Sequence, residues 1–222
     1  MTGLGNMHYF RLRDIKTPPF AYVTNKEEAI DSCPLCHMPF SEPRTSLEIE
    51  IFTTDSEVWE SRIEGRPMMA DLWLIGDNTF AAMLEQHMPG MFKKSPVEIV
   101  SWMTRSPGLL VTDPADFLKH KQHSGKPYYY RFSPVQSICL DAGLRDLFPA
   151  IRCNTCDREM PEIPIEYQRM PDISGELPAV ASLEGFCLEG YDYLFDQACK
   201  SILEKLFPEM MMEPLVSEPL PI

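Results

Sequence analysis

Cys33-Pro34-Leu35-Cys36 and Cys153-Asn154-Thr155-Cys156 are the two short stretches around which the rest of the chain is organised. Each is a Cys-x-x-Cys turn, and the two-residue spacer lets both sulfurs of a turn face one ion. Four thiolates are the number and type of ligand that tetrahedral zinc prefers. The second pair starts 117 residues after the first ends (153 − 36), so one shared ion joins distant parts of the chain. The sequence therefore predicts a structural Zn²⁺ bound by Cys33, Cys36, Cys153 and Cys156.

The long separation leaves other interpretations open, because zinc ribbons bring their second pair about 15–20 residues after the first. The pairs could instead be unrelated reduced thiols. Residues Cys33 to His37 also match the C-x-x-C-H pattern of haem attachment, although the N-terminus shows no apolar export segment. A thioredoxin-like redox motif needs a helix at the first cysteine, whereas the residues from Pro39 to Pro43 favour a loop.

The 222-residue chain is strongly acidic, with a net charge of −13. Residues 157–218 hold 14 acidic and 4 basic side chains, which places −10 in the last third (4 − 14). Such a field repels nucleic acid and anionic membranes and favours a basic protein partner, although solubility alone also explains it. The chain has no stretch of about 18 apolar residues, which predicts no membrane span. Seven cysteines without a signal-peptide pattern predict a reducing, cytoplasmic location, with Cys139, Cys187 and Cys199 as buried thiols.

Hydrophobic patterning predicts a mixed α/β (α+β) fold. Strands are expected over residues 8–12, 47–51, 71–75, 97–100, 109–112, 128–132 and 185–188. Helices are expected over residues 79–87, 114–120 and 193–207, capped by Asp77 or Asn78, by Asp113 and by Asp192. In the last of these helices the expected buried stripe is Leu194, Ala198, Ile202 and Leu206.

Two parts of the chain follow a similar pattern. Residues 72–76 are similar to residues 186–190, and each stretch precedes a helix, a proline and an extended segment. The similarity predicts two related strand–helix–strand units on mixed sheets, joined by a zinc-ribbon-like site with four cysteine ligands. Chance similarity of short amphipathic segments is the alternative. We expect a single compact body over residues 1–222, with two repeated halves of about 1–135 and 136–222 joined by zinc.

The layout resembles the myxobacterial double-CXXCG family. The resemblance rests on the strand at His8–Leu12, a Cys-Pro-x-Cys, a long middle, a second Cys-x-x-Cys and an ending over Phe186–Val216. It covers most of the chain in layout, and in residues only the cysteine pairs and the ends. His37 and Asp157 stand where the family has Gly. The resemblance implies an immunity protein that binds and neutralises one cognate bacterial toxin in the cytoplasm.

The sequence shows no recognisable catalytic set. It contains no G-x-S-x-G, no Gly-rich phosphate loop and no H-E-x-x-H. Four thiolates also leave zinc no open position for water. We therefore expect that the chain is not an enzyme. A zinc-containing enzyme with an unrecognised active site and a zinc-ribbon adaptor protein are the alternatives.

One acidic and aromatic segment is a possible contact region for the toxin. It contains Glu57, Trp59, Glu60 and Glu64. The resemblance implies that such side chains face a basic cleft of the toxin, and buried aromatic residues carry much of the energy of an interface. The alternative is an ordinary solvated loop over a core Trp.

Overall fold

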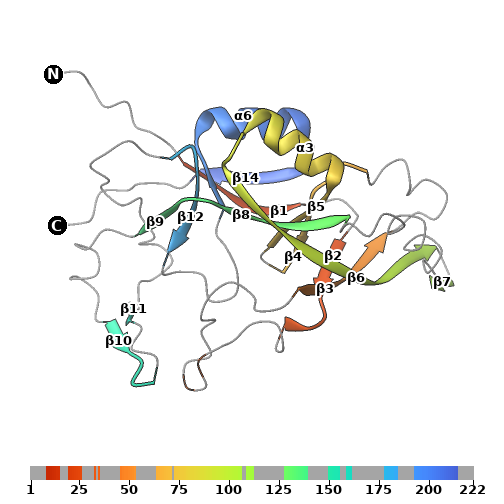
Figure 1. Ribbon diagram of the computed structural model, residues 1–222, viewed down its shortest axis with the longest axis horizontal. Coiled ribbons are helices and arrows are strands. Elements are labelled where there is room, and N and C mark those ends of the chain that lie inside the picture. The colour runs from red at the N-terminus through yellow and green to blue at the C-terminus, as the bar shows by residue number, and fades with distance from the viewer. Residues whose placement is uncertain are drawn as a thin grey trace.

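The computed structural model is a mixed α+β protein built mostly of strands, with two helices in its described part (Figure 1). This confirms the expected mixed α/β (α+β) class. The described residues are 9–15, 20–26, 33, 35, 46–53, 64–71, 73–106, 109–112, 128–139, 150–155, 159–161, 178–184 and 193–214. The expected strand at 185–188 and helix at 114–120 lie outside them.

Six strands pair in a closed ring. In order of pairing they are β2 (Phe20–Val23), β4 (Met68–Ala70), β5 (Trp73–Asp77), β8 (Tyr129–Pro134), β6 (Phe92–Ser106) and β3 (Leu47–Thr53), and β3 pairs again with β2. A seventh strand, β7 (Leu109–Thr112), continues from β6 outside the ring. The expected strands at 47–51, 97–100 and 109–112 are thus confirmed, and the second is part of a 15-residue strand.

The interior of this closed sheet follows from the alternation of side chains along its strands. Leu47, Ile49 and Ile51 are at most 2% exposed, and they alternate with Glu48 and Glu50 on the outer face. Every strand of the ring contributes buried side chains to the same apolar cluster. Burial of apolar area on this scale is the main favourable term in the stability of the ring.

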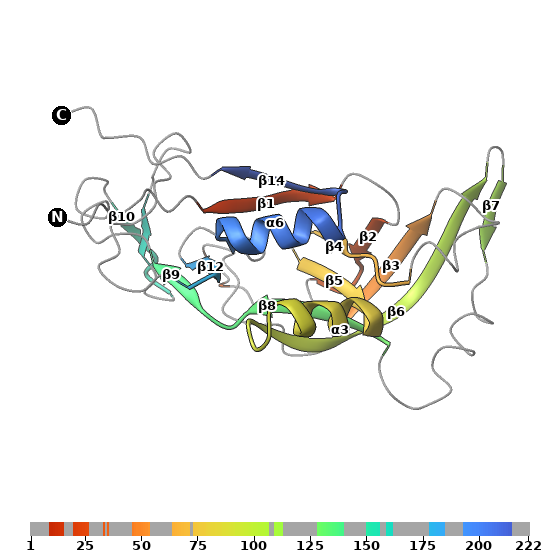
Figure 2. The same cartoon turned by 90° about the horizontal axis from the view of Figure 1, so that it is seen from above.

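A second, five-stranded sheet completes the body. Its order is β14 (Met210–Pro214), β1 (Phe10–Ile15), β13 (Tyr193–Phe195), β12 (Val180–Glu184) and β9 (Ser137–Cys139). Two short strands, β10 (Ala150–Arg152) and β11 (Glu159–Pro161), form a separate antiparallel pair. Because β1 lies between two strands from the end of the chain, the N-terminal segment is tied to the C-terminal segment (Figure 2).

The two sheets share one order of strands. In the closed sheet β2 is parallel to β4, and the following pairs β4–β5, β5–β8 and β8–β6 are antiparallel. In the five-stranded sheet β9 is parallel to β12, and β12–β13, β13–β1 and β1–β14 are antiparallel. The position of β8 in the first set corresponds to that of β1 in the second. The closed sheet therefore contains β8, which comes directly before β9 in the chain, and the five-stranded sheet contains β1, which comes directly before β2.

The helices α3 (Asn78–His87) and α6 (Gln197–Leu206) occupy equivalent places in these sets. Asp77 accepts a hydrogen bond from the Phe80 N–H, and Asp196, 119 positions later (196 − 77), accepts one from the Cys199 N–H. Such carboxylates satisfy N–H groups that a helix start leaves without intrahelical partners. The expected cap at Asp77 is confirmed. Both helices lie on one side of the strands (Figure 1).

The prediction for the last helix was wrong at its N-terminus. Residues Tyr193–Phe195 form a strand, the cap is Asp196 rather than Asp192, and the helix starts at Gln197. The buried side chains of α6 are Cys199 and Leu203, whereas Ala198 is exposed. An apolar run cannot by itself distinguish a buried strand from a helix, and the shifted start rotates the inward face of the helix.

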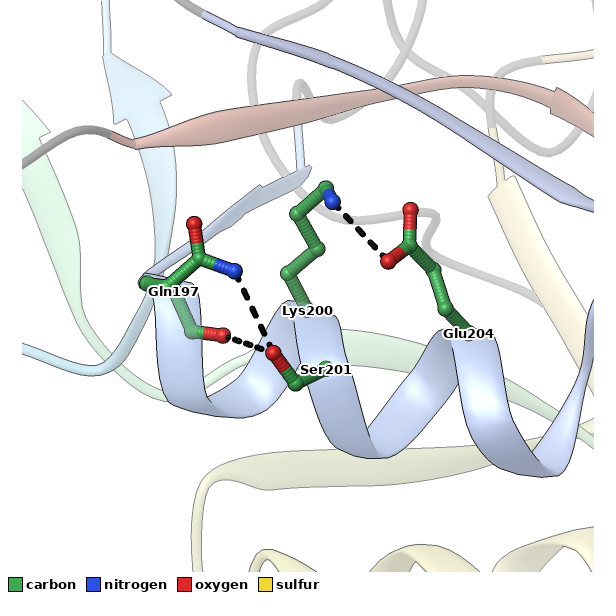
Figure 3. Close-up of polar contacts among 4 residues, drawn as sticks. All are labelled: Gln197, Lys200, Ser201 and Glu204. Atoms are coloured by element: carbon green, nitrogen blue, oxygen red, sulfur yellow. Dashed lines mark hydrogen bonds and ion pairs between the residues drawn. The ribbon is translucent and has the colours of Figure 1, made fainter.

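Beside its buried side chains, α6 carries polar contacts between residues four apart (Figure 3). The Nζ of Lys200 lies 2.9 Å from Oε2 of Glu204. The Oγ of Ser201 donates to the Gln197 carbonyl at 2.8 Å and accepts from the Gln197 amide at 3.2 Å. Pairs at this spacing stabilise a helix by about 0.2–0.5 kcal/mol each, so packing of the inner face holds α6 in place.

A buried tyrosine joins the two sheets. Tyr193, on β13 of the five-stranded sheet, donates its hydroxyl proton to the Phe132 carbonyl at 2.6 Å. The same oxygen accepts from the Leu74 N–H at 2.9 Å. Leu74 and Phe132 are paired residues of β5 and β8 in the closed sheet. The apolar cluster around this point also contains side chains from both sheets and both helices.

We expect Tyr193→Phe to lower the free energy of unfolding by about 1–3 kcal/mol. The change leaves a buried N–H and a buried carbonyl without the hydroxyl that satisfies them. Urea unfolding followed by circular dichroism measures the effect. Tyr22→Phe is the matched control, because Tyr22 is 54% exposed and its change should stay within about 0.5 kcal/mol. Equal stabilities for the two variants would show that the hydrogen bonds of the Tyr193 hydroxyl contribute nothing to the free energy of unfolding.

Candidate metal centre

The fold brings one cysteine of each Cys-x-x-Cys pair into contact. The Sγ atoms of Cys33 and Cys153 lie 3.6 Å apart, although the residues are 120 positions apart in the chain. Cys33 is 0% exposed and Cys153 is 4% exposed. Cys153 directly follows β10, whereas Cys33 lies between β2 and β3. Two of the four expected ligands therefore converge, from widely separated segments, at one buried point.

The distance between the two sulfurs excludes one kind of link and can be compared with the geometry of another. A disulfide bond is about 2.05 Å long, so these sulfurs are not joined by one. Four sulfurs at about 2.3 Å from a central zinc are about 3.8 Å from one another, if the arrangement is tetrahedral. The observed 3.6 Å is close to the edge of such a tetrahedron, and it is also the distance of a hydrogen bond between two thiols. The donors are also of the soft type that zinc prefers.

The three described spacer residues lie outside this buried point. Leu35 is 59% exposed, and Asn154 and Thr155 form an exposed turn. A Cys-x-x-Cys turn presents its sulfurs inward and its spacer outward in this way. Cys36 and Cys156 lie outside the described residues. In the described part, accordingly, no group of three or more Cys, His, Asp or Glu is arranged to hold a metal.

Cys199 shows what a buried cysteine outside such a site looks like. It is 4% exposed and lies in the first turn of α6, where it packs in the cluster between the sheets. Burial, and then the negative charge of Asp196, raise the pKa of its thiol to about 12. A metal ligand must be a thiolate, so this side chain behaves as a small apolar residue. Cys187 lies outside the described residues, as does the side chain of Cys139.

The acidic and aromatic segment expected to contact a toxin is described only at its end. Glu64 is exposed, and its Oε1 accepts a hydrogen bond from the Thr79 hydroxyl at 3.1 Å. Glu57, Trp59 and Glu60 lie outside the described residues. Their role as contacts remains a prediction.

A buried carboxylate that could suggest acid–base chemistry serves the fold. Asp77 is 1% exposed, and burial raises the pKa of its carboxyl group, an effect that hydrogen bonds from Phe80 and Gly65 oppose. Its Oδ1 accepts from the Phe80 N–H at 2.8 Å, and its Oδ2 accepts from the Gly65 N–H at 2.9 Å. Both oxygens are therefore occupied by backbone N–H groups, one at the start of α3 and one in the segment before β4.

Sequence reasoning missed a group of aromatic side chains on the outer face of β2 and β3. The Tyr22 and Phe52 rings meet edge to face with centroids 5.2 Å apart. Phe20 pairs with Phe52 across the two strands and is 37% exposed. The alternation of Phe20, Ala21 and Tyr22, read as a strand, could have revealed it.

Comparison with family models, with curated proteins and with solved structures found no match for this chain. Among the residues that the structure describes, no helix is long and apolar enough to cross a membrane. The resemblance to the double-CXXCG family therefore remains an expectation from the sequence.

Proposed function

We propose that this chain is a protein-binding scaffold held together by a structural zinc ion. More specifically, we propose an immunity protein that binds and neutralises a cognate bacterial toxin in the cytoplasm. The observation that carries the proposal is the 3.6 Å approach of the Cys33 and Cys153 sulfurs. It supports one shared site built from both cysteine pairs.

The proposed zinc ligands are Cys33, Cys36, Cys153 and Cys156. The ion supplies cross-linking rather than reactivity, since four thiolates complete its tetrahedral shell. It connects the segment after β2 with the segment after β10, which the backbone alone joins only through a long excursion. A rigid body of this kind presents a fixed surface to a partner, which lowers the entropy cost of binding.

The charge of the chain supports a basic partner. A net charge of −13 accelerates encounter with a cationic protein and disfavours nucleic acid and anionic membranes. The layout that resembles the double-CXXCG family supports a toxin as that partner. A zinc-containing enzyme and a zinc-ribbon adaptor are the competing proposals, and growth assays separate them from the first.

The proposal is tested by co-expression with the protein encoded by the gene directly upstream, which the proposal expects to be the toxin. We expect cells that carry the toxin alone to stop growing, and cells that also carry this chain to grow. A toxin from an unrelated locus is the control, because a cognate inhibitor protects against its own toxin only. Failure to protect against the adjacent toxin would sink the proposal.

A further inference from the structure

The outer face of β2 and β3 has no helix packed over it in the described part of the chain. The helix α3 packs over β5, β6 and β8, and α6 packs over β13 and β14. Figure 1 shows both helices on one side, with β2 and β3 below them. Tyr22, at 54% exposed, and Phe20, at 37%, are among the most exposed large apolar side chains of the described residues. We call Phe20, Tyr22, Phe52, Glu48, Glu50 and Glu98 the β2–β3 face.

This face combines aromatic rings with carboxylates. Phe20 and Tyr22 alternate with the buried Ala21, so both project outward from β2. Across the strands, Tyr22 is paired with Glu50, and Phe20 is paired with Phe52. Aromatic side chains are the commonest anchors of protein interfaces, because they bury much area at a small cost in entropy.

The carboxylates of the face are placed against one another. Glu48 of β3 is directly paired with Glu98 of β6, and Glu50 follows on the same side of β3. Like charges directly opposite one another destabilise a sheet. In the described part of the chain no ion pair joins a Lys or Arg to these three carboxylates. The nearest lysine on this face of β6, Lys94, lies over the Tyr130 ring, 5.0 Å from its centroid.

From this arrangement we infer that the β2–β3 face is the docking surface for a basic protein. A partner that inserts Lys or Arg between Glu48 and Glu98 relieves their repulsion, and its apolar or cationic groups cover the rings of Tyr22 and Phe52. A second copy of this chain is disfavoured, because its carboxylates would face the same carboxylates. Nucleic acid is repelled for the same reason. The inference rests on the proposed function, since the basic protein is the toxin.

The test measures binding of the purified zinc-loaded chain to the adjacent toxin by calorimetry. We expect Tyr22→Ala and Glu50→Lys each to weaken the affinity at least about tenfold. Loss of the Tyr22 ring should make dissociation faster, and reversal of the charge at Glu50 should make association slower. The matched controls are Val135→Ala and Glu85→Lys, which change an exposed apolar residue and an exposed carboxylate elsewhere. These should leave the affinity within about twofold. Thermal unfolding of each variant checks that the fold is retained.

The outcomes separate the two proposals. If the wild-type chain binds and both face variants bind equally well, the docking surface is wrong and the immunity function stands. If the wild-type chain does not bind the toxin, the proposed function fails and the inference fails with it. Sedimentation of the free chain tests whether a second copy of this chain occupies the β2–β3 face. A dimer that Tyr22→Ala dissociates would assign the face to a second copy and overturn the basic partner.

Discussion

Replacing Cys153 with Ser is expected to remove the zinc ion and to lower the free energy of unfolding by at least about 3 kcal/mol. Structural zinc contributes on the order of 10 kcal/mol to the folding of small domains, and serine does not replace a thiolate ligand. We expect a large loss because the proposed ion would tie together segments 120 residues apart, and its binding energy would offset the entropy cost of closing this long loop. Metal analysis of the purified protein and denaturant unfolding measure both effects.

The control for this experiment is Cys199→Ser. Cys199 is equally buried, at 4% exposed, but lies in α6 and has a thiol whose pKa is raised to about 12. Its replacement should cost about 1–2 kcal/mol for burying a hydroxyl and should keep one zinc per chain. Full zinc content and an unchanged melting temperature in Cys153→Ser would contradict the shared metal centre.

Replacing Gly76 with Ala is expected to cost about 2–3 kcal/mol. Gly76 lies on β5 under the first turn of α3, and a Cβ there would come within 2.7 Å of the Phe80 Cγ. Phe80 is 0% exposed and lies against Phe132 and Phe207, with ring centroids 5.1 Å from each, so the ring has no space to move into. Overpacking of a filled core costs about 1–3 kcal/mol. Denaturant unfolding checks the value.

The equivalent place in the second set of strands explains why glycine is needed. There the strand residue is Phe195 and the helix residue is Cys199, each 119 positions after Gly76 and Phe80 (195 − 76, 199 − 80). In the second set the large Phe195 lies beneath the small Cys199. In the first set the small Gly76 lies beneath the large Phe80, so each pair fills a similar space. We therefore expect Gly76→Ala to cost clearly less in a Phe80→Cys background. Strictly additive costs would show that the two side chains do not compete for the same space.

Several elements could be predicted from local patterns. The alternation of apolar and acidic residues predicted β3. The cap at Asp77 and the apolar face of Phe80 and Leu84 predicted α3, and the strand propensity of aromatic residues predicted β8. The start of α6 was not predictable, because Tyr193–Phe195 is an apolar run that suits a strand or a helix equally. Its pairing with β1 and β12 decides the outcome.

The candidate site divides in the same way. Cys-x-x-Cys spacing alone named the four expected ligands, because that spacing is a local requirement of metal binding. That Cys33 and Cys153 meet depends on the tertiary fold. The β2–β3 face was not found, because the residues of β2, β3 and β6 come to share one face only when these strands pair.

The sequence by itself determined the periodicity of the strands, the helix cap at Asp77, the acidic charge and the two Cys-x-x-Cys motifs. These depend on residues close together in the chain and on composition. Only the tertiary structure decided that β1 completes the C-terminal set of strands while β8 completes the N-terminal one. That choice rests on long-range hydrogen bonds and on a core shared by both helices, and no local pattern records which distant strands pair.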